Sequence, residues 1–381
     1  MNKSGTSRVL MIVFGKTKYD GRVLRSAEAL SKQYEVTLVG LGDCSIRPSV
    51  PIRYIEVQIS HNQGWLCHAL FIIKTGLIGF RVRPDIVHAH DYFLALHGWV
   101  ISRVTGATCV YDAHEFFPGI KERSRLRHWL FQLLERISIK RYDLVIATSE
   151  ERAQAIKDHY GLPELPIVVN NFAGLEEKIL DSCQDDQNTS LDLQAALQHG
   201  LPLVVYQGYM DVPSRCLDSL LQAFTKLRGK CALIMVGDGP DLDYLQKLAG
   251  DLGIKEHTLF TGRLSKSQLK SIMRAASVGV VIYSNKSVNN LLCTPNKIHE
   301  YARANLAIVA SNQLPLETML HTQSIGEIFD PDEPISIQQA ILKVLSNLES
   351  YETRIPEFLA HYSWDNEKRK LLDAYRSFEL K

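Results

Sequence analysis

The sequence of 381 residues has almost no excess of either charge, because 43 Lys and Arg residues face 42 Asp and Glu residues. A chain so balanced has no global field that attracts a polyanion, which argues against nucleic acid as the partner and leaves only local electrostatic recognition. The composition, 45% hydrophobic and 22% charged, is typical of a globular protein long enough for two domains.

Metal-binding cysteine pairs and a secretory signal are also missing. The seven cysteines are scattered and never spaced Cys-x-x-Cys, which predicts a reducing compartment and no zinc site. The polar start Met1–Ser7 leads into a predicted strand, so no signal peptide is expected. We therefore predict a cytoplasmic protein.

A long hydrophobic run is missing as well. The longest apolar stretch, Trp65–Phe80, is interrupted by His68 and Lys74, and it is shorter than the roughly 20 residues that a bilayer span needs. The stretch is predicted to be a buried helix.

The sequence does contain a regular alternation of short β-rich apolar runs with helical segments. Between the first two runs, Val23, Leu24, Ala27 and Leu30 fall at helical spacing and close a βαβ unit. This alternation predicts a parallel sheet covered on both faces. The runs of the first half are Arg8–Phe14, Glu35–Val39, Ile52–Val57, Ile86–Ala89, Thr108–Tyr111, Leu144–Thr148 and Ile167–Val169.

The same alternation restarts after a polar, acidic segment, Glu176–Gln198, that has little to bury. The strands predicted there are Leu203–Gln207, Ala232–Val236, Thr258–Thr261, Val278–Ile282 and Ala307–Ala310. The helices predicted there are Cys216–Leu227, Leu242–Leu252, Ser265–Ala276 and Lys297–Ala304, with a last helix over Trp364–Phe378.

The predicted fold class is α/β, with two Rossmann-like doubly wound domains facing a central cleft, because open sheets of this kind bind ligands at the carboxyl ends of their strands. The first domain is expected over 1–175, a linker region over 176–200 and the second domain over 201–355. For the C-terminal helix within 356–381, packing back on the first domain is one option.

Several motifs of the second half follow one another in a characteristic order. They are Val205–Gly208, Arg215, Leu220–Phe224, Leu233–Gly239, Phe260–Gly262, Pro295–Tyr301 and Ala307–Ser311. In order and spacing they resemble glycosyltransferase family four, the retaining group 1 transferases of GT-B fold. The first half matches less specifically, through Asp20–Val23, Pro84–His90 and Asp112–Glu115.

The resemblance implies a retaining transferase that moves a sugar from a nucleotide sugar, with UDP as the expected nucleotide, to a glycan, glycolipid or small-molecule acceptor. It implies bacterial surface polysaccharide or glycoconjugate synthesis and no bound metal or other cofactor. Two alternatives stay open. One is another GT-B enzyme, such as an inverting transferase or a nucleotide-sugar epimerase, and the other is a catalytically silent subunit that binds nucleotide sugars.

On the donor side, Glu300 lies one turn into a helix that is expected to begin after Pro295, because proline is a good helix starter. The family's glutamate at this place accepts hydrogen bonds from the ribose hydroxyls of the nucleotide. The alternative is a solvated glutamate favoured by the helix dipole. The resemblance also implies donor contacts for Thr294, Asn296 and Lys297.

Gly208 and Arg215 flank a turn before a predicted helix. The family has a basic residue here that stabilises the departing diphosphate, so Arg215 is a catalytic as well as a donor-binding candidate, and a guanidinium suits that task. A surface arginine is the alternative. Gly237 is expected to form a tight turn on the donor side, and Asp238 to serve that turn more than a ligand.

One position departs from the family pattern. Where members carry a second glutamate that meets the donor sugar, this chain has Leu292. We expect the backbone amides of Cys293 and Thr294 to serve instead, with Asn289 or Asn290 as polar substitutes. The departure bears on the identity of the donor sugar more than on the class of reaction.

On the other side of the predicted cleft, His114 follows a strand, where the family has a histidine close to the donor sugar and the acceptor. Imidazole can donate or accept a hydrogen bond at neutral pH, which makes His114 the second catalytic candidate. A purely structural histidine is the alternative. Asp91 and Glu115 are expected on the acceptor side.

The first loop, Asp20-Gly21-Arg22, supplies the remaining acceptor-side candidates. Gly21 lets backbone approach closely, and Arg22 can meet a phosphate or an acidic acceptor. In the alternative, Asp20 is simply the N-cap of the next helix.

His88 and His90 share one face of a strand and precede Asp91. This spacing can coordinate zinc. No other ligands cluster with them in the sequence, and the resembling enzymes use helix ends and basic residues in place of a divalent ion. No metal site is therefore predicted.

The segment 121–141 is strongly basic, with seven Lys and Arg residues against Glu122 and Glu135. Its apolar residues fall at helical spacing, and a basic amphipathic helix can lie on an anionic membrane. The protein would then be peripheral at the inner membrane face and the acceptor lipid-linked. The alternative is a helix that faces the core with those apolar residues, which are Leu126, Trp129, Leu130, Leu133, Leu134 and Ile137.

Overall fold

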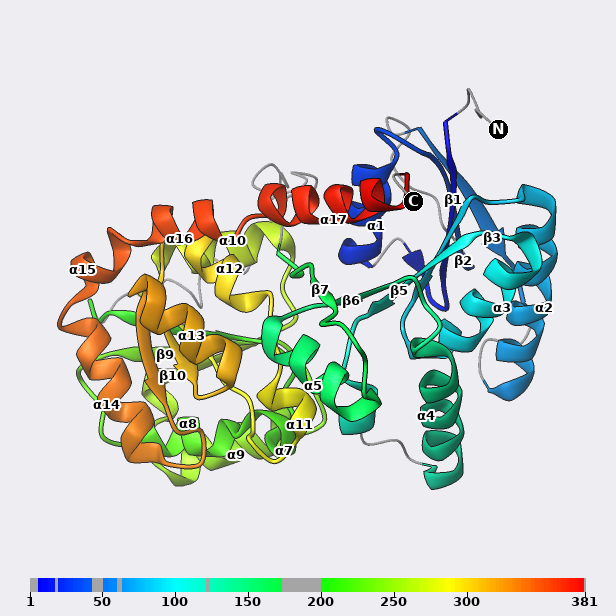
Figure 1. Cartoon of the computed structure of the whole chain (residues 1–381). Coiled ribbons are helices and arrows are strands. Elements are labelled where there is room, and N and C mark those ends of the chain that lie inside the picture. Colours follow the sequence, from blue (N-terminus) through cyan, green and yellow to red (C-terminus); the bar gives the residue numbers. More distant parts are fainter. Residues whose placement is uncertain are drawn as a thin grey trace. The chain divides into compact units, whose positions relative to one another are not determined.

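The computed structural model describes residues 6–17, 20–42, 51–59, 64–120, 124–172 and 200–379. The chain divides into two compact units (Figure 1). Unit 1 comprises Met1–Asn171 together with Trp364–Lys381, and unit 2 comprises Phe172–Ser363. Apart from Gly200, the predicted linker region 176–200 lies outside the described residues.

Unit 1 is built on a seven-stranded parallel sheet in the order β3-β2-β1-β4-β5-β6-β7. The strand order reverses beside β1, which pairs with both β2 and β4 and so marks a topological switch point. The strands are β1 (Arg8–Val13), β2 (Glu35–Leu41), β3 (Ile52–Val57), β4 (Ile86–His90), β5 (Thr108–Ala113), β6 (Leu144–Ala147) and β7 (Ile167–Val168).

Helices cover both faces of this sheet, as predicted. Because successive residues of a strand point to opposite faces, Val9 and Met11 pack with helices α1 and α17, whereas Leu10 and Ile12 pack with α2 and α3. The described helices of unit 1 are α1 (Gly21–Leu30), α2 (Trp65–Val82), α3 (Ala95–Thr105), α4 (Arg125–Ile139), α5 (Glu150–Tyr160) and α17 (Trp364–Glu379), with short 3-10 turns η2 (Tyr92–Leu94) and η3 (Phe117–Gly119).

Helix α17 belongs to unit 1, where its Leu371 and Tyr375 pack in the same core as α1 and β1. Helix α16 (Ile355–His361), just before it, packs in unit 2 through Phe358. The segment expected to act as one C-terminal piece, 356–381, is therefore shared between the two units.

Helix α2 corrects the prediction of a buried helix over Trp65–Phe80. Only one row of its side chains is buried, and on the opposite side Ile73, Leu77 and Phe80 are 57–61% exposed. The helix is 18 residues long, and within the described part of the chain it is the one helix long and apolar enough to cross a membrane. A helix that is apolar all round is usually buried on all sides, so its bare side is unusual.

Helix α4 buries only part of the apolar row that the alternative placed against the core. Leu126, Trp129 and Ile137 are exposed, whereas Leu134 packs against the buried Phe131, and Glu135 is buried as well. Glu135 tolerates burial because the hydroxyls of two tyrosines each donate a hydrogen bond of 2.5 Å to its carboxylate. The start of the basic segment, 121–123, lies outside the described residues.

Unit 2 repeats the architecture with a six-stranded parallel sheet in the order β10-β9-β8-β11-β12-β13. The switch point lies at β8, which pairs with β9 and β11. The strands are β8 (Leu203–Gln207), β9 (Ala232–Val236), β10 (Thr258–Gly262), β11 (Val278–Val281), β12 (Ala307–Ser311) and β13 (Gly326–Phe329).

Two hydrophobic cores, one on each face of this sheet, hold its helices. The predicted fold class of two doubly wound α/β domains is thus confirmed for each unit. The described helices are α7 (Val212–Arg215), α8 (Leu217–Phe224), α9 (Leu242–Asp251), α10 (Lys266–Ala275), α11 (Val288–Leu291), α12 (Lys297–Arg303), α13 (Leu314–Gln323), α14 (Pro334–Leu345), α15 (Leu348–Glu352) and α16, with a 3-10 turn η4 (Lys255–His257).

Candidate functional site

A buried ion pair lies at the carboxyl end of the unit 1 sheet. Arg22 of α1 donates two hydrogen bonds to Asp112 of β5, at 2.9 and 2.6 Å, and a third to the carbonyl of Val169 at 2.6 Å. The two side chains are 4% and 1% exposed. The sequence suggested that Arg22 could meet a phosphate or an acidic acceptor. In the structure its three side-chain nitrogens instead donate hydrogen bonds inside unit 1.

The rest of the first loop supports the start of α1. The Asp20 carboxylate accepts a hydrogen bond of 3.1 Å from the backbone amide of Val23, which is the N-cap geometry weighed as the alternative. Gly21, the first residue of the helix, lies beside the flexible end of Arg25.

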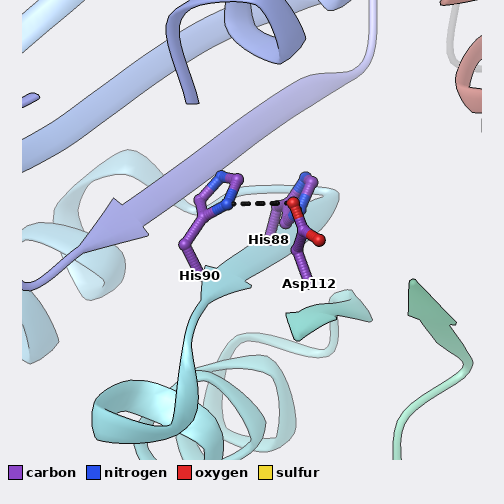
Figure 2. A group of neighbouring side chains, drawn as sticks. All are labelled: His88, His90 and Asp112. Carbon is purple, nitrogen blue, oxygen red and sulfur yellow. Dashed lines mark ion pairs between the residues drawn. The ribbon is translucent and has the colours of Figure 1, made fainter. Parts of the chain in front are cut away.

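Three histidines surround the same aspartate. The Oδ2 atom of Asp112 lies 3.3 Å from Nδ1 of His90, 3.6 Å from Nε2 of His114 and 3.9 Å from Nε2 of His88. Figure 2 shows His88 and His90, on β4, pointing toward Asp112 on the neighbouring strand β5. His114 is the most exposed member at 18%, so it is the one that can meet a ligand.

Tyr375 of α17 joins this cluster from a remote part of the chain. Its hydroxyl lies 2.6 Å from Nδ1 of His88. Burial raises the pKa of Tyr375 well above its usual value, so the phenol keeps its proton, and the tautomer of His88 sets which of the two groups donates. The other ring nitrogen of His88, Nε2, is buried and has no hydrogen-bond partner among the described residues.

The charges of the cluster follow from these contacts. Burial alone would raise the pKa of Asp112, but the charge of Arg22 and hydrogen bonds from His114 and His90 hold it well below its usual range. Burial would likewise lower the pKa of His114, but its hydrogen bond and ion pair with Asp112 raise it. Burial lowers the pKa of His88 and His90, which stay neutral. The imidazolium form is therefore favoured at the exposed position, His114.

Asp91 and Glu115, the other acceptor-side candidates, differ in burial and in hydrogen bonding. Asp91 has a positive φ of 67° and caps the turn η2, accepting a 2.8 Å hydrogen bond from the amide of Tyr92. Burial raises the pKa of Asp91 to about 6, although the charge of His114 opposes the shift. The side chain of Glu115 is exposed.

His88, His90 and Asp112 offer ligand atoms within 4.8 Å of one another, which is close enough for a metal ion. The guanidinium of Arg22, however, already binds both oxygens of Asp112. The positive charge of the guanidinium would repel a metal cation buried beside it. Nε2 of His88 and Nε2 of His90 have no hydrogen-bond partner among the described residues, so the charge of Arg22 is the one observation here that disfavours a metal ion, and the absence of a metal stays a prediction.

In unit 2, a polar triad lies where β8 ends and α12 begins. The Nζ atom of Lys297 lies 2.7 Å from the carboxylate of Glu300. In the orientation that satisfies both neighbours, the side-chain amide of Gln207 donates to Glu300 at 3.2 Å and accepts from Lys297 at 2.9 Å. Lys297 and Glu300 are partly exposed, so both can exchange these contacts for a ligand.

Arg215 ends the short helix α7, close to the same strand. Its guanidinium lies 3.8 Å from the centre of the Tyr283 ring, which follows β11. Stacking on an aromatic face restrains the planar guanidinium, and one of its N–H groups donates to the backbone carbonyl of Ser214 at 3.5 Å. Arg215 is therefore a partly buried cation with contacts inside unit 2.

Thr294 and Leu292 define the neighbouring turn. The hydroxyl of Thr294 is buried and finds no protein hydrogen-bond partner among the described residues, and such orphan groups are rare without a ligand or water. Leu292 is buried at 7% exposure, so it packs inside and presents nothing to a sugar. The side-chain amide of Asn290 bonds the backbone carbonyls of Ser214 and Ser284, and so it holds this turn in place.

The start of α12 agrees with the prediction. The helix begins at Lys297, after Pro295, with Asn296 as N-cap. The amides of His299 and Glu300 bond the carbonyl of Asn296, at 3.0 Å each. Glu300 lies in the first turn, where the backbone amides favour a carboxylate.

Gly237 lets two loops of unit 2 touch. Its φ is 137°, and a Cβ atom at this position would lie only 1.9 Å from the carbonyl oxygen of Gly208. Gly237 therefore acts through the position of the Gly208 loop, and any other residue would displace that loop. Asp238 accepts a 2.8 Å hydrogen bond from the amide of Gly239, as its predicted turn role requires.

The sequence did not single out Asp112, Gln207, Tyr283 or Tyr375 as site residues. Asp112 and Gln207 each lie within two residues of a chosen candidate at a strand end, and that place alone is a usable signal. Tyr283 and Tyr375 carry no such signal, because their partners are remote in the sequence.

Each unit thus presents polar candidates at the carboxyl end of a doubly wound parallel sheet, near the strand where the order reverses. A tandem of two such units is the architecture of the GT-B glycosyltransferases. A profile described as Glycosyltransferase Family 4 matches residues 22–173, and one described as Glycosyl transferases group 1 matches residues 201–347. The chain belongs to the group 1 glycosyltransferases of family four.

Similar proteins carry related descriptions. An uncharacterized glycosyltransferase of Methanocaldococcus jannaschii is 22% identical over 338 residues, which are 84% of this chain and 82% of that protein. A GDP-mannose:cellobiosyl-diphosphopolyprenol alpha-mannosyltransferase of Xanthomonas campestris is 23% identical, over 82% of this chain and 80% of that protein. The crystal structure of HepE from Anabaena in complex with UDP matches with a TM-score of 0.72 at 15% identity, covering 97% of this chain and 100% of that one.

Proposed function

We propose that this glycosyltransferase moves a sugar from a UDP-sugar to a glycan or lipid-linked acceptor with retention of configuration, in bacterial surface polysaccharide or glycoconjugate synthesis. The observation that carries the proposal is the triad of Gln207, Lys297 and Glu300 within the group 1 region. A carboxylate suits a ribose diol, and an ammonium beside it suits the attached phosphates.

In the proposed reaction, the bond between the anomeric carbon and the diphosphate oxygen breaks, and the acceptor oxygen bonds to that carbon from the same face. The acceptor proton leaves with the nucleoside diphosphate. Arg215 and Lys297 stabilise the negative charge that develops on the departing phosphates, and the buried hydroxyl of Thr294 supplies a further hydrogen bond. His114, favoured as imidazolium by Asp112, donates a hydrogen bond to the donor sugar.

No metal or other cofactor takes part in the proposed reaction, because cationic side chains supply the positive charge that the leaving group needs. The stacked guanidinium of Arg215 and the occupied carboxylate of Asp112 support that choice. We further place the enzyme in the cytoplasm, peripheral at the inner face of the membrane, where lipid-linked acceptors would be met.

Two competing proposals have specific support. The name of the Xanthomonas relative favours GDP-mannose as the donor, whereas the HepE complex favours UDP. The buried Leu292, at the place where the family pattern has a carboxylate, favours a subunit that binds nucleotide sugars without turning them over.

A panel of UDP-, GDP- and ADP-sugars tested by thermal shift separates the donors. We expect a UDP-sugar to stabilise the protein, and Glu300→Ala to raise its Kd about 10- to 100-fold, since charged hydrogen bonds contribute about 1.5–3 kcal/mol. Glu256→Ala, which removes an exposed glutamate of the same unit, is the matched control and should bind normally. Equal binding by both variants would refute the ribose contact, and stabilisation by GDP-mannose alone would replace the proposed donor.

A further inference from the structure

Three neighbouring helices of unit 1 carry most of the exposed large apolar side chains. Helix α3 contacts both α2 and α4 (Figure 1), and Trp65 of α2 stacks on Phe131 of α4 with ring centres 5.8 Å apart. Of the sixteen large apolar side chains that are exposed in the described residues, ten belong to these three helices. We call the outward sides of α2, α3 and α4 the α2–α4 face.

The bare side of α2 is a continuous stripe. Trp65, Ile73, Leu77 and Phe80 are exposed and fall within one side of the helix at the usual turn of about 100° per residue. On α4, Trp129 and Ile137 form the corresponding outward row. Exposed apolar side chains that gather in this way mark a surface that binds something else.

The charge of the same surface has one sign. Basic residues stand among the exposed apolar ones, at Lys74 and Arg81 on α2, Arg103 on α3 and Arg136 on α4. The three helices together contain a single carboxylate, Glu135. That carboxylate is buried and bonded to two tyrosines. A surface that is both apolar and purely cationic complements an anionic lipid bilayer.

The inner side of helix α2 is fastened to unit 1, which leaves the helix able to lie along such a bilayer but not to cross it. A Cβ atom on Gly79 would come within 2.7 Å of Ile101 on α3, so the two helices touch closely. Thr75 bonds His97 of α3 at 2.7 Å, and Lys74 donates to the carbonyl of Gln58 at 2.7 Å. Only the outer side of α2 is therefore free to enter lipid.

We propose that the α2–α4 face is a docking surface for an anionic membrane, with the apolar stripe of α2 and the outward row of α4 entering the lipid headgroup region. A second copy of this chain is the weaker occupant, since two such faces would bring cationic side chains together without carboxylates to pair them. The bilayer supplies the negative charge that the face lacks.

Docking would bring the candidate site of unit 1 near the lipid. A helix that connects parallel strands runs back along the sheet, so it starts at the carboxyl edge of the strand before it. Trp65 begins α2, and Trp129 lies near the start of α4. Both tryptophans therefore lie toward the sheet edge that holds His114 and Asp91.

Co-sedimentation of the full chain with sucrose-loaded vesicles tests the proposal. We expect binding to equimolar phosphatidylglycerol and phosphatidylcholine, weakening as salt is raised, and little binding to phosphatidylcholine alone. The triple variant Ile73→Gln, Leu77→Gln, Phe80→Gln should lower partitioning at least about tenfold. A control variant, Tyr244→Gln with Ile335→Gln, removes exposed apolar residues of unit 2 and should bind like the wild type.

A second measurement covers the case in which the triple variant fails to fold. Brominated lipid should quench the fluorescence of wild-type tryptophans, and Trp129→Phe should lose part of that quenching. Equal partitioning of the triple and control variants, no vesicle binding by wild type, or a stable dimer that the triple variant abolishes would each overturn the proposal. The assay needs neither donor nor acceptor, so its failure would leave the proposed transfer reaction intact.

Discussion

Replacing Asp112 with alanine is expected to destabilise unit 1 by about 3–5 kcal/mol, because the charge of Arg22 is then buried without its partner. The pair is almost completely buried, with Arg22 and Asp112 joined by two hydrogen bonds of 2.6 and 2.9 Å. Since the chain has two units and need not unfold in one step, amide hydrogen exchange of β5 and α1 is the suitable measurement.

The double variant Arg22→Met, Asp112→Leu is the matched control. Removing both partners leaves no buried guanidinium without a carboxylate, so the double variant should recover part of the stability that Asp112→Ala loses, although the Val169 carbonyl, His90 and His114 still lose a partner. In Asp112→Ala, NMR titration should also show a lower pKa for His114, because the hydrogen bond and ion pair that raise it are gone. Unchanged exchange in Asp112→Ala would mean that the pair does not hold these elements together.

The same pair makes unit 1 sensitive to acid. The pKa of Asp112 in the folded chain lies well below its usual value, so its stabilising contribution is present above the unfolded pKa of about 3.9. That contribution is lost progressively as the pH falls from there toward the folded pKa. The stability difference between wild type and Asp112→Ala should therefore shrink in the same pH window.

Replacing Arg215 with alanine is expected to lower kcat about 10²- to 10³-fold, the usual cost of removing one fixed donor from a developing negative charge. Its guanidinium is held 3.8 Å from the centre of the Tyr283 ring, which restrains the cation that we propose stabilises the departing diphosphate. KM for the donor should change much less, because the interaction strengthens as the leaving group gains charge. Initial rates of nucleoside diphosphate release measure both constants.

Two variants control this experiment. Arg215→Lys keeps the charge but loses the planar stacking group, so it should fall between wild type and alanine. Arg263→Ala removes an arginine of unit 2 that is 81% exposed and pairs with Asp238, and it should keep wild-type rates. A normal kcat in Arg215→Ala would remove this residue from the reaction.

The strands were largely predictable because most are buried on both faces and read as short apolar runs. Ile52–Val57, Leu203–Gln207 and Ala232–Val236 have the predicted bounds. The strand β13 was missed, because only Phe329 of its four residues is buried. With so few buried residues, an edge strand leaves no periodic pattern to detect.

The candidate site was predictable where residues follow strand ends and only there. His114 and Gly208 could be placed at the correct edge of a sheet from the order of strands. The ion pair of Arg22 could not be predicted, because its partner Asp112 lies 90 positions away in the sequence. The bond between Tyr375 and His88 spans 287 positions and leaves no local trace.

Helices α2 and α4 show why apolar spacing alone does not locate the core. In α4 one edge of the apolar row, Leu126, Trp129 and Ile137, is exposed, while the core side accepts Glu135 because two tyrosines satisfy its carboxylate. In α2 nearly every position is apolar, so the pattern gives no preferred side. Only the packing of these helices distinguishes a core surface from a docking surface.

The most direct test of nucleotide-sugar transfer uses the donor that stabilises the wild-type protein. The chain is incubated with that donor and candidate acceptors, and NMR follows nucleoside diphosphate release and the anomeric proton of the transferred sugar. We predict acceptor-dependent turnover of a UDP-sugar, with the donor's anomeric configuration kept in the product. Measurable donor binding without turnover for any acceptor would contradict the account and identify a silent subunit, and an inverted product would contradict the retaining mechanism.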